Sequence, residues 1–122
     1  MAPTSAGFPL PRRLGASRDY GRVFADPVRS SDRFFTVLAR RNDSTFARLG
    51  LAISRKAAKR AVDRNKLKRM ARESFRMLRL PSADFVVLAR PEAASASRED
   101  LRQSLDAHFS KLARRVEPRR DG

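Results

Sequence analysis

The sequence predicts an α+β fold, a two-layer sandwich in which helices pack on one small mixed sheet. Three observations predict this class. The chain has 122 residues, enough for a single hydrophobic core. Apolar residues alternate with a period of two in some segments and recur every three or four residues in others. The two kinds of segment follow one another in the order α-β-β-α-β-α, which is typical of an α+β protein.

We divide the chain into three parts. Residues 1–12 form a flexible N-terminal segment with three prolines, and they lack the apolar stretch of a secretory signal. Residues 13–116 form one domain. Residues 117–122 form a basic flexible tail. No apolar run approaches the length that spans a membrane.

The first predicted element is a short helix over residues 17–25. It begins at a serine, a favourable N-cap residue, and Asp26-Pro27 ends it. Tyr20, Val23 and Phe24 follow the i, i+3, i+4 pattern and therefore share one face of the helix.

Two strands are predicted next, over residues 34–41 and 46–54. The turn-favouring run Asn42-Asp43-Ser44 separates them, so we expect an antiparallel hairpin. In the second strand the apolar face consists of Leu49, Leu51 and Ile53, which predicts a core face. The opposite face is small and polar, a floor that another element could cover: Arg48, Gly50, Ala52 and Ser54.

The segment 55–79 carries most of the charge. It contains eleven basic and two acidic residues, a net of +9 out of +15 for the whole chain. On a helical wheel one arc is mainly apolar: Leu67, Ala71, Ser74 and Leu78. The neighbouring arc is cationic, with Arg64 at its edge: Asn65, Lys68, Arg69, Arg72 and Arg76. Pro81 ends this amphipathic helix.

The last two elements are a strand and a helix. Residues 84–90 are apolar almost throughout, which indicates a strand buried on both faces at the centre of the sheet. Residues 91–96 read as a linker. The final helix begins after Ser97, and its core-facing stripe is spaced at i, i+4, i+8 and i+11: Leu101, Leu105, Phe109 and Leu112.

Composition excludes several chemistries. The chain has no Cys, so disulfides, thiolate metal sites and cysteine catalysis are excluded. The single histidine, His108, excludes histidine-clustered metal sites, and we expect it to be structural or solvent-exposed. The acidic residues are dispersed along the chain. We therefore predict no catalytic side chain, no metal site and no cofactor held by this chain alone.

The charge pattern instead favours a polyanionic partner. The chain has 28 Lys and Arg against 13 Asp and Glu, and 23 of the basic residues are Arg. Arg64, Lys68, Arg72 and Arg76 stack three like-charge i,i+4 pairs, each of which costs a few tenths of a kcal/mol. A nucleic acid that neutralises these charges explains why the cost is tolerated.

The same residues carry a family resemblance. The run RNKLKR at 64–69, with AV before it at 61–62 and RESFR after it at 72–76, resembles the signature of the bacterial ribonuclease P protein subunit. Lys66 stands where that family usually has Arg. LGLAISRK at 49–56 and DFVVLAR at 84–90 resemble the strands that enter and leave the motif. Tyr20 and Phe24 match an aromatic pair of the first helix, and the resemblance extends from about Arg13 to Leu112.

The resemblance implies a fold and a role. The family connects its two parallel strands through the motif helix in a left-handed βαβ crossover, against the usual right-handed rule. Its members are cytoplasmic subunits of an endoribonuclease that cleaves precursor tRNA at its 5′ end. Catalysis and the magnesium ions belong to a large RNA, ribonuclease P RNA. The implied partners are that RNA and precursor tRNA, with no DNA and no membrane.

The resemblance also implies two sets of site residues. One set contacts the RNA partner: Arg60, Arg64, Asn65, Lys66, Lys68, Arg69, Arg72 and Arg76. The other forms a groove between helix and sheet for the single-stranded 5′ leader: Tyr20, Phe24 and Phe35, with Ser54 and Lys56 at its floor. Leu38 stands where some members have a groove aromatic.

Three alternative functions remain open from the residues alone. A basic RNA-binding module such as a ribosomal protein has the same composition, and only the register of the motif separates the two. A helix-turn-helix DNA-binding protein would use residues 60–78 as its recognition helix, but the strands argue against that arrangement. A metal-dependent nuclease acting alone needs a carboxylate cluster that the sequence lacks.

Overall fold

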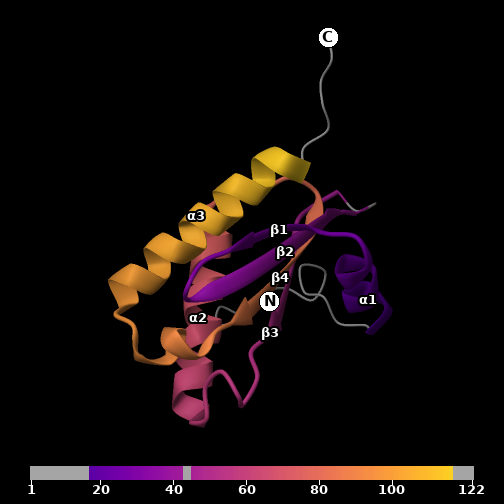
Figure 1. Cartoon of the computed structure of the whole chain (residues 1–122). Coiled ribbons are helices and arrows are strands. Elements are labelled where there is room, and N and C mark those ends of the chain that lie inside the picture. Colours follow the sequence, from indigo (N-terminus) through magenta and orange to yellow (C-terminus); the bar gives the residue numbers. More distant parts are fainter. Residues whose placement is uncertain (1–16, 43–44, 117–122) are drawn as a thin grey trace, which may run out of the picture.

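The computed structural model describes residues 17–42 and 45–116 (Figure 1). The segments 1–12 and 117–122, for which the sequence predicts flexible ends, lie outside the described residues. The elements follow in this order: α1 (Ser17–Ala25), β1 (Val28–Ser31), β2 (Phe35–Arg41), β3 (Arg48–Ala52), α2 (Ala61–Met77), β4 (Ala83–Ala89), the 3₁₀ helix η2 (Pro91–Ser95) and α3 (Arg98–Val116). Within the described part, no helix is both long and apolar enough to cross a membrane.

The four strands form one mixed sheet in the order β1-β2-β4-β3. β2 is antiparallel to both β1 and β4, whereas β3 is parallel to β4. The mixed sheet and the α+β class are as predicted. The strand β1 was not predicted, because its four residues, VRSS, have only one apolar side chain and sit at the edge of the sheet.

The predicted hairpin between residues 34–41 and 46–54 is wrong. β2 and β3 do not pair with each other, because β4 lies between them and pairs with both. Val86, for example, is opposite Leu38 on one side and Gly50 on the other. β4 is apolar on both faces and its first five residues are buried, so it takes the central position, as its composition predicted.

The chain passes from β3 through α2 to the parallel strand β4, which forms the βαβ unit that the resemblance implies. α2 lies within the basic segment 55–79, and Pro81 follows its end as predicted. The left hand of this crossover stays a prediction.

One face of the sheet carries the main core, where α2 and α3 lie side by side (Figure 1). The rings of Phe75, Phe85 and Phe109, from α2, β4 and α3, meet edge to face with centroids 5.7–6.0 Å apart. The four stripe residues predicted for the last helix are all fully buried here: Leu101, Leu105, Phe109 and Leu112.

The other face of the sheet is partly covered by α1. Val23 of α1 is buried against Leu38 of β2 and Val86 of β4, with Tyr20 packed beside them. α1 and α2 therefore lie on opposite faces of the sheet. This separation decides which side chains can form one surface.

His108 is structural, as expected. It is buried on α3, and its Nδ1 lies 2.7 Å from Ser30 Oγ of β1, while its Nε2 lies 3.2 Å from Asp32 Oδ2. Ser104 donates a hydrogen bond of 2.6 Å to the same carboxylate. Burial alone would raise the pKa of Asp32, but hydrogen bonds from Ser104 and two backbone N–H groups, together with His108, lower it to about 2. This network ties α3 to the turn between β1 and β2.

Candidate nucleic-acid interface

α2 has one buried face and one basic face. The buried residues pack on the sheet and on α3: Leu67, Met70, Ala71, Ser74 and Phe75. Of the predicted RNA-contact residues, the exposed ones are Arg60, Asn65, Arg69 and Arg76, and the half-buried ones are Arg64, Lys66, Lys68 and Arg72. None of the eight is buried in the core. The helix therefore presents a cationic surface while its apolar face holds it in place.

The start of α2 is fixed by arginine. Arg64 donates hydrogen bonds from Nη1 to the carbonyl oxygens of Ala58 and Lys59, at 3.0 and 2.9 Å. Arg60 is the N-cap residue, makes no side-chain cap hydrogen bond and pairs with Asp63 at 3.2 Å. The positive end of the helix dipole thus points toward a group of cations, an arrangement that attracts an anion.

The motif cations do not all share one direction. Arg64, Lys68 and Arg72 are spaced four residues apart and follow one stripe of α2. Lys66 lies on another side of the helix, where its Nζ is 3.4 Å from the carbonyl oxygen of Ala96 after η2. The side chain at the position where the family usually has Arg is thus turned toward the α3 side.

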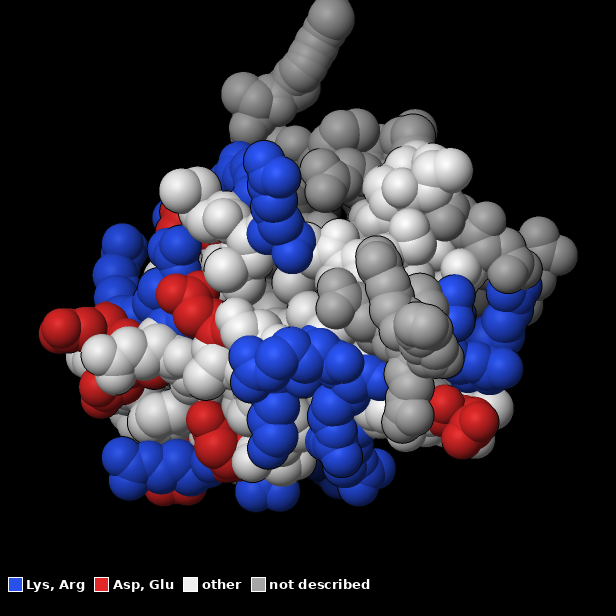
Figure 2. Space-filling view, turned by 90° about the horizontal axis from the view of Figure 1, so that it is seen from above, with Lys and Arg blue, Asp and Glu red and all other residues white. Residues whose placement is uncertain are grey.

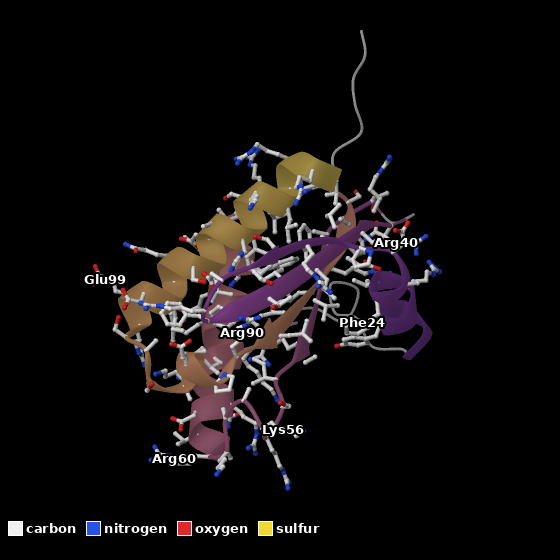
Figure 3. The ribbon with its side chains drawn as sticks, viewed as in Figure 1. Phe24, Arg40, Lys56, Arg60, Arg90 and Glu99 are labelled. Carbon is white, nitrogen blue, oxygen red and sulfur yellow. The ribbon has the colours of Figure 1, made fainter. Side chains whose placement is uncertain are left out.

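A second surface lies on the opposite face of the sheet. Tyr20 of α1 rests directly on Gly50 of β3, so that a Cβ at Gly50 would come within 2.8 Å of the ring atoms Cε1 and Cζ and of the hydroxyl oxygen. Only glycine lets the ring approach the strand this closely. Phe24, one turn later, is 47% exposed and projects from α1 beside the sheet (Figure 3).

The prediction that Phe35 lines the groove is wrong. Phe35 is fully buried in the main core, on the face covered by α2 and α3. Side chains alternate along β2, so Phe35 and Tyr20 are on opposite faces of the sheet. Leu38 does face α1, but Val23 covers it and leaves it 3% exposed. The aromatic surface that the structure brings together consists of Tyr20 and Phe24.

Ser54 and Lys56 lie beyond the end of β3 and are exposed. Ser54 Oγ accepts a hydrogen bond from the N–H of Ala57 at 3.2 Å, which folds the loop that leads into α2. Figure 3 shows Lys56 and Arg60 at the same end of the molecule. The two residues therefore connect the end of the polar sheet face with the start of α2.

On the polar floor predicted for the second strand, Tyr20 of α1 covers Gly50, whereas Ser54 is exposed. One of its members, Arg48, is held by a buried carboxylate that sequence reasoning did not single out. Asp84 is 4% exposed and accepts two hydrogen bonds from Arg48, at 2.8 and 2.9 Å, and one from Asn42 at 2.7 Å. The signal in the sequence that could have identified this buried partner was a carboxylate, Asp84, at the start of an otherwise apolar strand.

The described residues offer no metal site, since no three His, Asp or Glu side chains among them gather into one group. They offer cations instead. In the view of Figure 2, Lys and Arg side chains occupy the middle of the molecule and also its edges. Asp and Glu side chains lie mostly to the left and right of that view.

A mixed sheet with helices on both faces, a cationic crossover helix and an aromatic pair on the sheet define a basic nucleic-acid-binding protein of the α+β class. The model of the family described as Ribonuclease P matches residues 8–113. The chain belongs to the ribonuclease P protein family. It is the protein subunit of the ribonucleoprotein that processes the 5′ end of tRNA.

Relatives cover nearly the whole chain. The ribonuclease P protein component of Methylococcus capsulatus is 47% identical over 111 residues, which are 89% of this chain and 87% of the relative. That of Thioalkalivibrio sulfidiphilus is 45% identical over 109 residues, 88% of this chain and 91% of the relative.

Solved structures share the fold. The RNase P protein of Staphylococcus aureus superposes with a TM-score of 0.77 at 28% identity, over 87% of this chain and 98% of that one. The RNase P protein of Thermotoga maritima gives a TM-score of 0.70 at 30% identity, also over 87% and 98% of the two chains.

Proposed function

We propose that this protein binds ribonuclease P RNA through the basic face of α2 and holds the 5′ leader of precursor tRNA against the sheet beneath α1. The observation that carries the proposal is the placement of the two surfaces. The cations of α2 and the aromatic pair of α1 lie on opposite faces of one sheet, joined at one end by the loop of Ser54 and Lys56. One rigid sheet can then hold two RNA segments at a fixed spacing.

The leader-binding part of the proposal depends on stacking. A single-stranded leader has unpaired bases, and base–aromatic stacking contributes about 1–3 kcal/mol per base. Phe24 offers an exposed ring, and Tyr20 offers a half-buried ring that rests on Gly50. Lys56 lies at the end of this surface, where its ammonium group can contact the phosphate backbone of the RNA leader. Mature tRNA has no leader and gains nothing from this surface.

In this proposal the RNA partner performs the cleavage, in the cytoplasm, and holds the magnesium ions that activate the attacking water. The protein supplies no acid–base pair and no metal ligands. Its residues bind and orient: α2 neutralises phosphates of the catalytic RNA, and α1 with β3 keeps the leader extended beside the cleavage position. Catalytic help from such a subunit comes from positioning the substrate.

The proposal is tested by cleavage of a leader-bearing precursor tRNA with the protein alone, with the cognate RNA alone, and with both. We expect cleavage to require the RNA, and the protein to raise it at physiological magnesium. Cleavage by the protein alone would contradict the assignment of catalysis to the RNA.

A second experiment tests the leader surface. Phe24→Ala removes an exposed ring, so the melting temperature should hardly change. Affinity for precursor tRNA should fall by roughly five- to hundredfold, the loss of one stacked base, whereas affinity for mature tRNA should stay the same. Equal losses for both tRNAs would remove Phe24 from the leader site.

A further inference from the structure

Several described arginines are held by one of two kinds of guanidinium contact. One kind pairs with Asp carboxylates, which cancel the charge: Arg48, Arg60 and Arg102. The other kind donates to backbone carbonyl oxygens: Arg40, Arg64 and Arg115. A carbonyl oxygen holds a guanidinium in position but leaves its positive charge available to another group. Arg64 belongs to the surface of α2, and the other two lie elsewhere.

Arg40 and Arg115 each reach the backbone of another arginine, from opposite faces of the sheet. Arg40 of β2 donates from Nη1 to the carbonyl oxygen of Arg22 in α1, at 2.9 Å. Arg115 of α3 donates from Nη1 to the carbonyl oxygen of Arg29 in β1, at 3.2 Å. Arg29 is paired with Leu38, two residues before Arg40, so Arg29 and Arg40 are diagonal neighbours on one face, about 7–8 Å apart. We call Arg22, Arg29, Arg40 and Arg115 the β1–β2 arginine patch.

The patch carries four positive charges with little compensation. Arg22, Arg29 and Arg115 are exposed and Arg40 is half-buried. Among the carboxylates of residues 20–42 and 45–116, none forms an ion pair with any of the four. The acidic residues nearest in sequence to Arg22 and Arg29 are Asp19, Asp26 and Asp32. Asp26 is exposed between α1 and β1, and Asp32 is held by Ser104 and His108. Like charges on neighbouring residues repel one another, and an anion shared between them relieves the repulsion.

The patch is well separated from the start of α2. In Figure 3, Arg40 lies at the upper end of the sheet, and Lys56 and Arg60 lie at the lower end. β2 alone, with seven residues, spans about 23 Å between these ends. The Debye length at physiological salt is about 8 Å. The patch is therefore electrostatically independent of the cations at the start of α2.

We propose that the β1–β2 arginine patch binds a second stretch of RNA phosphodiester backbone, separate from the one on α2. Planar guanidinium groups match phosphate oxygens with two parallel hydrogen bonds, and anchoring on carbonyl oxygens lowers the entropy lost when they bind. The inference rests on the proposed function, since it takes RNA as the partner. Two contacts with RNA phosphates, one at each end of the sheet, would fix the orientation of the protein on its RNA.

The test uses the full chain with the double substitution Arg40→Gln/Arg115→Gln. The matched control is Arg33→Gln/Arg98→Gln, which removes two exposed cations away from the patch. Affinities for ribonuclease P RNA and for precursor tRNA are measured separately over a series of salt concentrations. For one of these RNAs we expect roughly tenfold weaker binding and a log–log salt slope smaller by about 1.4–1.8, corresponding to two lost phosphate contacts. The RNA that responds is the source of the bound backbone.

The inference is overturned if the double variant and its control behave alike with both RNAs. If the Gln variant melts at a lower temperature, Arg40→Lys/Arg115→Lys decides, because it keeps the charge. A salt slope restored by Lys supports phosphate binding, and a slope as low as that of the Gln variant contradicts it. Arg69→Gln on α2, measured in parallel, separates the two proposals. If Arg69→Gln weakens binding and the patch variant does not, only the patch inference fails; if neither does, the proposed function fails as well.

Discussion

Gly50 and Tyr20 show how one missing side chain shapes a surface. The ring of Tyr20 occupies the space that a Cβ at position 50 would need. The ring therefore rests on β3, one helical turn from the exposed Phe24. In our proposal, Gly50 shapes the leader site through Tyr20, without a contact of its own.

For this reason Gly50→Ala should weaken leader binding. The new methyl group meets the far end of the Tyr20 side chain, which can swing aside, so we expect the melting temperature to fall by only a few degrees. Affinity for precursor tRNA should fall by about 1–3 kcal/mol, the stacking of one base. Binding of mature tRNA is the control. An unchanged affinity for precursor tRNA would show that Tyr20 packs on the sheet without contributing to the leader site.

Asp32 makes stability depend on pH in the acid range. Its pKa is about 2 in the folded protein and 3.8 as a free side chain. A lowered folded pKa stabilises the protein above pH 4, and the contribution is lost as pH falls from about 4 to about 2. Asp32→Asn should therefore flatten the fall of the melting temperature over this range. Asp26→Asn, which removes an exposed carboxylate outside the network, is the control. Equal acid sensitivity of Asp32→Asn and the unmodified protein would exclude this role.

At the scale of the element, α2 separates packing from binding around its circumference. Its buried residues reach the core, and Arg69 lies on the exposed side. Binding and stability should therefore be separable by substitution within this one helix.

Arg69→Ala should lower the log–log salt slope of binding to ribonuclease P RNA by about 0.7–0.9, the loss of one phosphate contact. The far-UV circular dichroism spectrum should stay unchanged, because the side chain is off the buried face. Arg98→Ala, at the exposed start of α3, gives the matched loss of charge and should leave the slope unchanged. A collapsed spectrum, or an unaltered slope for Arg69→Ala, would show that this part of the helix is structural.

Elements with strong local patterns were predictable from the sequence. The central position of β4 followed from its apolar composition, and the stripe of α3 followed from its spacing. The pairing of the strands could not be predicted in this way. A turn-favouring run shows that the chain reverses direction, but it does not show which strand lies next to which in the sheet. Phe35 was misplaced for the related reason that alternation gives two faces without saying which of them a helix covers. The anchoring of Arg40 and Arg115 depends on contacts between distant segments, so no local pattern could predict it.

At the scale of the whole molecule, a net charge of +15 in 122 residues opposes compactness. Salt shortens the Debye length from about 30 Å at 0.01 M to about 8 Å at 0.15 M, which weakens repulsion between distant cations. We expect the melting temperature of the free protein to rise by several degrees over this range. A charge-neutral osmolyte at matched osmolality is the control. A melting temperature that does not respond to salt would show that repulsion is negligible in the folded chain.

The strand order also sets when the protein can fold during its synthesis. β2 and β3 each find their main partner in β4, and Phe35 pairs with Ala89, 54 positions further along the chain. Until the ribosome has released β4, β3 has no partner strand and β2 has only β1. The arginine-rich segment between β3 and β4 then has only the β1–β2 pair on which to pack. Such distant pairings slow folding. The nascent chain thus passes through a long period as an unfolded polycation in an environment rich in RNA, and closure of the sheet by its last strand ends that exposure.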